Sequence, residues 1–396
     1  IKMTYFSLIP INMCLNESHI KIELIDKMNE NYLSKSLSHY LNQCKTDINN
    51  YEDDWDNMKR ITNPYEYIHT PLSSLKYCIS KYKPISRAFF KLIEIYNTFN
   101  LEIEYAHKNI NCFHLAEGPG GFIEAMCYLR DNPKDNYYGM TLIDNKNNNI
   151  PSWKKCEKLL EKNKNIYLEY GLDKTGNLFC PENLLYCIEK YGHKMDFITG
   201  DGGFDFSQDF NSQENQASRL ILTEIIYAIL MQKQNGSFVL KIYDIFLKST
   251  VEFIYLLNCL YKKVYIIKPN TSRFANSEKY IMCKGFRFSN IDFIKNKLIS
   301  IIKVLYNIDF KKYNIKSILN LPLQHIYINQ IQEINAILGN QQIETITNTI
   351  KLIENKKSDK ILQYKNNNIS KCIQWCIKNN IPYNNYNIYT NLFKKN

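Results

Sequence analysis

Three charged side chains stand beside apolar segments, where a buried strand would begin or end. Asp201 follows the run MDFIT closely, Lys241 closes the run GSFVLK, and Glu278 precedes the run KYIMC. A charged group at the end of a buried strand costs free energy unless it is paired or has a chemical role. Two carboxylates and an ammonium at one edge of a sheet could orient a hydroxyl group, move a proton or stabilise developing negative charge. A structural network of ion pairs is the alternative.

A glycine-rich segment, LAEGPGGF at 115–122, follows another apolar run and opens a predicted helix. Glycines let a backbone approach a ligand closely, and a helix N-terminus offers free N–H groups. The segment lacks the G-x-G-x-x-G spacing of a dinucleotide site and the Lys-Ser/Thr of a P-loop. It therefore suits a nucleoside with a short charged tail, such as S-adenosylmethionine, whose amino group Glu117 would pair with. A tight strand-to-helix turn without a ligand is the structural alternative.

The elements that must position these residues alternate along the middle of the chain. Short runs rich in β-branched and aromatic residues predict strands at 111–116, 137–143, 195–199, 236–241, 263–268 and 279–283. Helical patterns lie between most of them, at 120–130, 152–162, 181–191, 213–233 and 247–260. This alternation predicts an α/β fold with a mostly parallel sheet covered on both faces. Only about ten residues separate the last two strands, so we expect an antiparallel pair at the sheet edge.

Three regions differ in pattern. Residues 1–75 mix short apolar runs with acidic and Asn-rich stretches, and we predict a helical N-terminal extension there. Residues 76–290 hold the alternating strands and helices, and residues 291–396 form a predicted helical C-terminal region. Apolar residues recur at helical spacing from Ile328 to Leu338, which indicates a helix packed on the central domain or on a partner.

The composition favours a globular protein with a polyanionic partner. Of the 396 residues, 45% are hydrophobic, and the formal net charge is +11. That surplus favours RNA or DNA, although the abundance of Asn, Lys, Ile and Tyr would also follow from nucleotide bias in a genome. The 12 cysteines form no C-x-x-C pair, so we expect free thiols in a reducing intracellular compartment and no bound metal. Neither a secretory signal nor a membrane-length apolar run is evident, so we expect no membrane association.

Five motifs, taken in order, resemble those of one family. They are S-R-A-F-F-K-L-x-E at 86–94, E-G-P-G-G-F at 117–122, D-G-G-F at 201–204, F-V-L-K at 238–241 and S-R-x-x-N-S-E at 272–278. This set resembles the FtsJ-like ribose 2′-O-methyltransferases, and within them it is most similar to the cap-1 mRNA methyltransferases, including those of large DNA viruses. The resemblance covers residues 80–290, and the order of the motifs is more specific than any single one.

The resemblance implies a Rossmann-like methyltransferase sheet, mostly parallel with its last strand antiparallel, and helical N- and C-terminal extensions. It carries a Lys-Asp-Lys-Glu catalytic tetrad over to Lys91, Asp201, Lys241 and Glu278. Lys91 depends on the resemblance, because the amphipathic pattern of its own helix favours a place on the solvated face.

The resemblance also implies S-adenosylmethionine as the cofactor. The residues that it assigns to cofactor binding are Glu117, Gly118, Pro119, Gly120, Gly121, Phe122, Thr141, Asp173, Asn177 and Asp201. Glu117 stands where many members have Asp, and Phe274 stands where the cap enzymes often have Pro. Asp144 is one candidate for the acid that follows the second strand, with Asp173 or Asn177 as the alternative contact to adenosine.

Lys241 would act on a ribose 2′-hydroxyl group in one of two ways. It would remove the proton, or it would orient the hydroxyl and stabilise alkoxide charge as an ammonium. Lys91 and partial burial would lower the pKa of Lys241, whereas Asp201 and Glu278 would raise it. The sequence leaves both roles open.

A methyl acceptor on ribose implies RNA as the partner, because the 2′-hydroxyl distinguishes RNA from DNA. We expect cap-1 methylation of the first transcribed nucleotide of capped mRNA, with other capping or transcription proteins as further candidate partners. Two alternatives are methylation of ribosomal or transfer RNA and a catalytically idle RNA-binding scaffold of a capping or transcription complex. A viral source would place the protein in the host cytoplasm or the virion.

Overall fold

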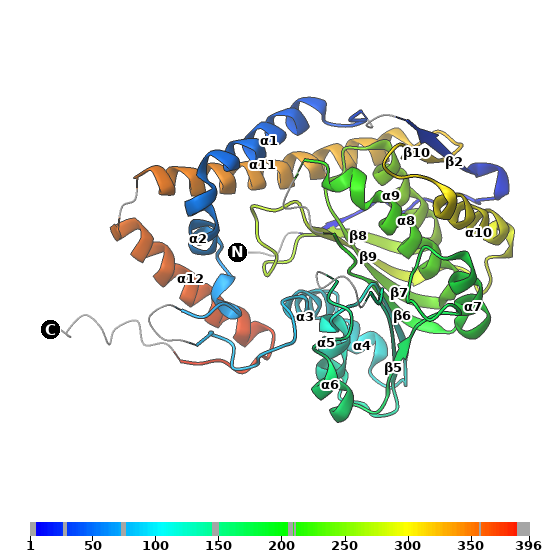
Figure 1. Ribbon diagram of the computed structural model, residues 1–396, viewed down its shortest axis with the longest axis horizontal. Helices are drawn as coiled ribbons and strands as arrows, with labels where there is room; N and C mark the ends of the chain where they lie inside the picture. Colours follow the sequence, from blue (N-terminus) through cyan, green and yellow to red (C-terminus); the bar gives the residue numbers. More distant parts are fainter. Residues whose placement is uncertain are drawn as a thin grey trace.

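The structure is a computed structural model that describes residues 5–26, 30–72, 77–144, 150–204, 209, 211–355 and 358–385. The strands of its main sheet are β1 (Tyr5–Ser7), β3 (Asn111–Leu115), β4 (Asn136–Met140), β5 (Ile166–Glu169), β6 (Met195–Gly200), β7 (Gln232–Ile242), β8 (Tyr261–Ile267) and β9 (Lys279–Phe286). Their order across the sheet is β1-β8-β9-β7-β6-β3-β4-β5 (Figure 1). The five strands from β7 to β5 run parallel, and β9 runs antiparallel to β7 and β8. This arrangement confirms the α/β fold with a Rossmann-like sheet.

The six strands predicted from the sequence are all present, and the expected antiparallel pair is β8 and β9. Its predicted position at the edge is wrong, because β9 lies between β7 and β8, and β1 pairs with the outer side of β8. The sequence analysis missed β1 and β5. Each is three or four residues long, which is too short for an alternating pattern to reveal.

Helices cover both faces of the sheet (Figure 1). One face carries α3 (Ala88–Thr98), α4 (Leu101–Tyr105), α5 (Gly121–Arg130) and α6 (Glu157–Lys162), and the other carries α7 (Pro181–Tyr191), α8 (Gln213–Met231), α9 (Lys248–Leu260) and α10 (Asp292–Asn307). On β7, Phe238 and Leu240 belong to the core beneath α8 and α9, whereas Val239 belongs to the core beneath α3 and α5. Since successive strand side chains point to opposite faces, Lys241 lies on the face that α3 covers.

The terminal regions fold together beside the sheet (Figure 1). The N-terminal region contributes η1 (Glu17–His19), β2 (Ile20–Ile25), α1 (Lys35–Asp47), η2 (Ile48–Tyr51), α2 (Glu52–Thr62) and η3 (Glu66–Ile68), and the C-terminal region contributes β10 (Asn314–Leu319), α11 (His325–Asn355) and α12 (Ser358–Lys378). Helices α1 and α2 pack against α11, and η3 packs against α12. Strands β2 and β10 pair in a small second sheet. Both terminal regions are thus largely helical, but they also contain the strands β1, β2 and β10, which the sequence did not reveal because their partners lie far away along the chain.

The helix expected around Ile328–Leu338 lies within α11, and its buried side chains Ile331, Ile334 and Leu338 join the core of the main domain. All twelve cysteines lie in the described ranges and are free. Among the helices of those ranges, none combines the length and the apolar character that crossing a membrane requires.

Candidate active site

A cavity of about 880 Å³ opens at the carboxyl edge of the parallel strands, where ligands bind in open α/β sheets. Its walls come from the start of α3, from the end of β7, from the segments that follow β3, β4, β5, β6 and β7, and from the residue that precedes β9. The predicted site residues that line it are Glu117, Gly118, Pro119, Thr141, Asn177, Asp201, Lys241 and Glu278. The predicted residues that do not line it are Lys91, Gly120, Gly121, Phe122 and Asp173.

The four residues of the predicted tetrad form two ion pairs. Lys241 Nζ lies 3.2 Å from Asp201 Oδ1 and donates to the backbone carbonyl oxygen of Asp201 at 2.7 Å. Lys91 Nζ lies 2.8 Å from Glu278 Oε1. The four side chains are between 11% and 14% exposed, so each is shielded from bulk water and three of them still reach the cavity.

Strand register explains why these side chains meet. Lys241 on β7 stands opposite Tyr280 on β9, and the Tyr280 hydroxyl donates to Asp201 Oδ1 at 2.8 Å. Asp201 directly follows β6, which runs parallel to β7 and ends at the same edge. Lys91 reaches the group from α3, because that helix covers the face on which Lys241 lies.

The charges of the tetrad fix the protonation of its members. Burial alone would lower the pKa of Lys241, but Asp201, Tyr243 and Glu278 outweigh it, and the pKa of Lys241 rises above its usual value. Burial would raise the pKa of Glu278, but Lys91 and Lys241 lower it to about 2. Lys241 is therefore an ammonium and Glu278 a carboxylate at neutral pH in the ligand-free protein, which favours the orienting role over the base.

Buried contacts hold the segment that leads into Glu278. The Glu94 carboxylate on α3 accepts hydrogen bonds from the backbone N–H groups of Asn270 at 2.9 Å and Thr271 at 3.1 Å, and also from their side chains. Lys268 Nζ donates to the backbone carbonyl oxygen of Glu278 at 2.8 Å. Glu94 is the last residue of the motif at 86–94. Nothing in the local pattern indicated that its carboxylate holds the segment at Asn270 and Thr271, which is far away in the sequence.

The motif S-R-x-x-N-S-E has a structural explanation. Ser272 Oγ donates to Glu278 Oε1 at 2.8 Å, and Asn276 accepts from Lys268 through both its backbone and its side-chain oxygen. Ser277 Oγ donates to Asp244 Oδ2 at 2.9 Å. Ser272 therefore anchors the carboxylate of Glu278, whereas Asn276 and Ser277 hold the segment that precedes it, and none of the three lines the active-site cavity.

The glycine loop is built around Glu117. Its carboxylate accepts from the backbone N–H groups of Phe122 at 2.7 Å and Ile123 at 3.0 Å, at the start of α5. Burial raises the pKa of Glu117 to about 8. A Cβ atom on Gly118 would lie 2.7 Å from the Ser152 carbonyl oxygen, so glycine permits this close approach to the loop after β4.

Three other residues of the loop shape the turn instead of lining the cavity. Gly120 has φ +114°, in the left-handed region that favours glycine. A Cβ atom on Gly121 would collide with Ser86 Oγ at the entry to α3, so this glycine allows α5 to pack closely. Phe122 is fully buried in the core beneath α3 and α5. None of the three lines the cavity, and their contact with the cofactor stays a prediction.

Residues 84–286 match the model of the FtsJ-like methyltransferase family, a span that contains the glycine loop and the whole tetrad. The chain belongs to the FtsJ-like methyltransferase family. It is 30% identical over 278 residues to cap-specific mRNA (nucleoside-2′-O-)-methyltransferase 2 of Danio rerio, which is 64% of this chain and 35% of that protein. It is 31% identical over 193 residues to the human cap-specific mRNA (nucleoside-2′-O-)-methyltransferase 1, which is 46% of this chain and 22% of that protein.

The matched region thus spans between 22% and 35% of the length of these two relatives. Among solved structures, the chain is similar to a ribosomal RNA methyltransferase from Plasmodium falciparum, with a TM-score of 0.36 and 22% identity. That alignment covers 51% of this chain and 97% of the other.

Asp173 does not line the cavity of the FtsJ-like domain. Its Oδ1 atom accepts from the backbone N–H of Thr175 and from Asn183 Nδ2, both at 2.9 Å, so it stabilises the loop after β5. The expected contact of Asp173 with adenosine is therefore not supported, whereas Asn177 does line the cavity. Asp144 does not line it either, and residues 145–149 lie outside the described part of the chain.

The sequence analysis missed several residues of the FtsJ-like site. Tyr243, which directly follows β7, lines the cavity, and burial raises its pKa to about 12. Glu224 on α8 is buried and accepts from the backbone N–H of Gly202 at 3.1 Å, and burial raises its pKa to about 8. A strand-end position could have revealed Tyr243, but Glu224 lies in a largely apolar helix with no motif around it.

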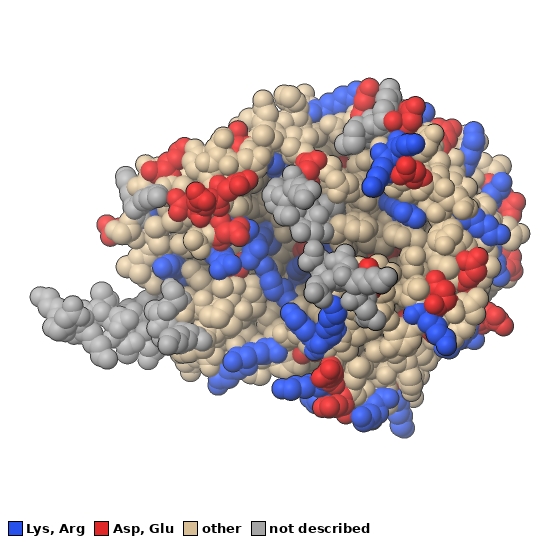
Figure 2. All heavy atoms as spheres, in the orientation of Figure 1, with Lys and Arg blue, Asp and Glu red and all other residues tan. Residues whose placement is uncertain are grey.

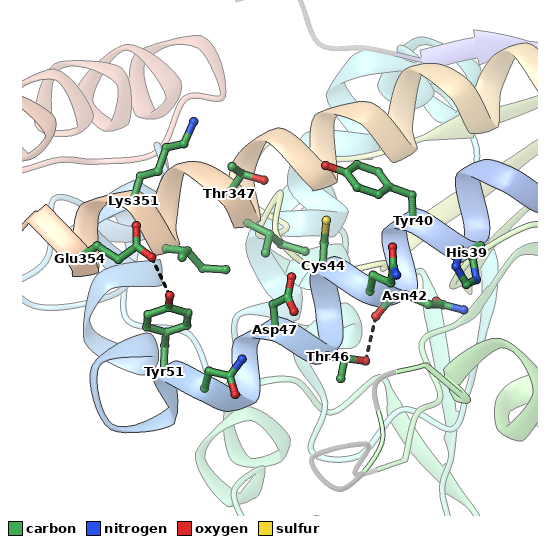
Figure 3. A pocket seen from close by; sticks show the side chains of 14 residues that line it. His39, Tyr40, Asn42, Cys44, Thr46, Asp47, Tyr51, Thr347, Lys351 and Glu354 are labelled. Carbon is green, nitrogen blue, oxygen red and sulfur yellow. Dashed lines mark hydrogen bonds between the residues drawn. The ribbon is translucent and has the colours of Figure 1, made fainter.

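Another cavity, of about 830 Å³, lies between α1 and α11 (Figure 3). Tyr51 donates to Glu354 Oε1 at 2.6 Å on its wall, and Thr46 Oγ1 donates to the carbonyl oxygen of Asn42 at 3.0 Å. It shares no lining residue with the cavity of the FtsJ-like domain. All of its lining residues lie outside residues 84–286, the span that matches the family model.

Proposed function

We propose that this chain is an S-adenosylmethionine-dependent RNA ribose 2′-O-methyltransferase that acts on the first transcribed nucleotide of capped mRNA. The observation that carries the proposal is the meeting of the ion pairs Lys241–Asp201 and Lys91–Glu278 beside the glycine loop. Membership of the FtsJ-like family supports methyl transfer. The names of the relatives support capped mRNA as the substrate.

The residues around the glycine loop fit S-adenosylmethionine. The cavity volume of about 880 Å³ lies within the range of about 300–1,000 Å³ that is usual for cofactor sites. Glu117 offers a carboxyl group to an amino group, whose positive charge would lower the raised pKa of Glu117 and favour its carboxylate form. Gly118 lines the cavity without a side chain, and Thr141 and Asn177 offer polar atoms. When bound, this cofactor supplies an activated methyl group.

The tetrad would orient the acceptor hydroxyl group. The Lys241 ammonium donates a hydrogen bond to the ribose oxygen and stabilises the negative charge that develops there. Asp201, which accepts a hydrogen bond from the Tyr280 hydroxyl, holds the ammonium in place, and its negative charge helps to keep Lys241 protonated. Lys241 would have to lose its own proton before it could remove the proton of the hydroxyl group, and the neighbouring carboxylates oppose that loss. We therefore propose that Lys241 acts as an orienting cation and that the hydroxyl proton passes to solvent as the oxygen accepts the methyl group.

RNA is the proposed partner because the 2′-hydroxyl is absent from DNA. Figure 2 shows Lys and Arg side chains along a hollow in the middle of one face, between the lobe of α2 and α12 and the lobe of α3. Together with the net charge of +11, this surface is suited to a phosphate backbone. Methylation of ribosomal or transfer RNA and an idle scaffold are the alternative outcomes of the test.

The test offers tritiated S-adenosylmethionine with three RNAs of one sequence: capped, uncapped, and capped with a 2′-O-methyl group already on the first nucleotide. Label on capped RNA alone is the expected result. Label on the uncapped RNA would favour ribosomal or transfer RNA, and no label on any RNA would favour the scaffold. The Lys241→Ala variant, which should stay unlabelled, controls for a contaminating activity.

A further inference from the structure

Two arginines and one buried glutamate meet beside the active-site cavity. Glu66 in η3 has a fully buried side chain, and its carboxylate lies 2.6 Å from Arg273 Nη2 and 3.9 Å from Arg87 Nη2. Arg87 lines the active-site cavity. Arg273 lines a smaller cavity of about 230 Å³, whose wall includes Ser277, the neighbour of Glu278. The cluster therefore borders the place where the acceptor ribose must lie.

The carboxylate of Glu66 accepts hydrogen bonds from Arg273, Asn63 and Thr70. Arg273 Nε and Nη2 donate to the two carboxylate oxygens at 3.0 and 2.6 Å, the bidentate geometry that guanidinium and carboxylate groups favour. Burial raises the pKa of Glu66, but Arg273 and Arg87 lower it far below its usual value, so Glu66 stays ionised. One carboxylate therefore lies beside two guanidinium groups, and it pairs with Arg273, the closer of the two.

Arg87 is left with donors that have no strong acceptor. A guanidinium has five N–H groups. Its Nη2 atom donates to the Thr271 carbonyl oxygen at 3.4 Å, and within the described residues its buried Nε atom has no hydrogen-bond partner. Its side chain is 32% exposed, so a ligand in the cavity can reach it.

The groups around Arg87 do not cancel its charge. Glu278 is near enough to affect it but is already paired with Lys91 at 2.8 Å. His69 stays neutral, because burial and the charge of Arg87 lower its pKa to about 3. The surroundings therefore keep a net positive charge at Arg87.

We infer that Arg87 binds a phosphate group of the RNA next to the acceptor ribose. The inference rests on the proposed function and names a contact of the same site. Arg87 and Lys91 are four residues apart at the start of α3, about 6 Å along the helix axis. Arg87 and Glu278 line the same cavity, so a phosphate at Arg87 and a ribose near Glu278 would belong to neighbouring positions of one RNA strand. A guanidinium suits this task because its planar fork binds two phosphate oxygens.

The test measures RNA binding directly, by fluorescence anisotropy of a short 3′-labelled RNA with S-adenosylhomocysteine present. Arg87→Ala should raise the Kd for RNA about tenfold and reduce the slope of log K against log salt by about 0.7–0.9, the loss of one phosphate contact. Arg87→Lys should keep the salt slope but recover only part of the affinity, because it retains the charge without the fork. Lys316→Ala removes an exposed cation on β10 and serves as the matched control, with Kd and slope unchanged.

Two RNAs identify which phosphate is bound. An equal loss of affinity with capped RNA and with 5′-hydroxyl RNA would assign a backbone phosphodiester, and a loss with capped RNA alone would assign the triphosphate bridge; both outcomes support the inference. Wild-type Kd and salt slope in a correctly folded Arg87→Ala variant would overturn it. A wild-type protein that binds RNA through Arg87 but transfers no methyl group would contradict the proposed function alone, and one that binds no RNA would overturn both.

Discussion

Lys91 Nζ lies 2.8 Å from Glu278 Oε1, although the amphipathic pattern of its own helix favours the solvated face for Lys91. Glu278 directly precedes β9, so the Lys91 side chain reaches from α3 to the start of that strand, and it is only 13% exposed. Ser272 holds the other side of the Glu278 carboxylate. Lys91 is therefore one half of a shielded ion pair and not a surface lysine.

Removing either partner of this pair should disable the site. We expect Lys91→Ala and Glu278→Ala each to lower kcat/KM for methyl transfer by about 100-fold or more. Either change leaves the remaining charge of the pair without its partner and alters the charges next to Lys241. The double variant should lose little beyond either single variant, since the two side chains act together. Methyl-transfer kinetics with the four proteins checks this, and independent, additive losses would contradict it.

Lys241→Ala should abolish methyl transfer while cofactor binding persists. The expected loss in kcat is about 100-fold or more, because the acceptor oxygen loses its hydrogen bond and the stabilising charge. Calorimetric titration with S-adenosylhomocysteine measures the retained binding. Lys263→Ala, at an exposed lysine of β8, is the matched control and should keep full activity. Turnover close to wild type in Lys241→Ala would remove this residue from the chemistry.

The pH dependence of turnover distinguishes an orienting cation from a base. Since the neighbouring carboxylates raise the pKa of Lys241 above its usual value of about 10.4, the ammonium persists throughout neutral and mildly alkaline pH. With saturating cofactor, we expect the single-turnover rate to be nearly constant between about pH 7 and pH 9. If Lys241 acted as the base, the rate would instead rise about tenfold per pH unit over this range.

Glu94→Gln should slow methyl transfer without weakening cofactor binding. The variant keeps the size of the side chain, but its amide cannot accept all the hydrogen bonds that Asn270 and Thr271 donate to the carboxylate. The segment that carries Glu278 then loses its anchor, and unpaired buried donors should lower the free energy of unfolding by about 1–3 kcal/mol. Glu102→Gln, at an exposed position of α4, is the control. A fall in cofactor affinity with kcat intact would argue against this role.

Glu224 should make stability fall as the pH rises. Burial raises its folded pKa from an ordinary value of 4.5 to about 8, so between these values the folded protein holds a proton that the unfolded chain has lost. The free energy of unfolding therefore decreases as the pH rises through this window. Glu224→Gln mimics the neutral carboxyl, so the variant should gain stability relative to wild type between pH 5 and pH 9 in denaturant unfolding. An unchanged difference across that range would refute the shift.

The sequence by itself determined the local elements and the chemistry that they carry. The six strands, most of the crossover helices and the glycine loop follow from apolar periodicity and turn residues, which act over a few neighbouring positions. The placement of Asp201, Lys241 and Glu278 at one edge follows as well, because parallel strands end on the same side of a sheet and an antiparallel strand begins there.

Only the tertiary structure decided how distant segments meet. In the folded protein, β1 pairs with β8, Lys91 pairs with Glu278 and Glu66 pairs with Arg273. Gly121 permits the close packing of α5 against the entry to α3. The tertiary structure also fixed the protonation of Lys241, since burial and opposing charges act together only in the assembled site. These outcomes depend on contacts between residues far apart in the chain, for which a local pattern carries no signal.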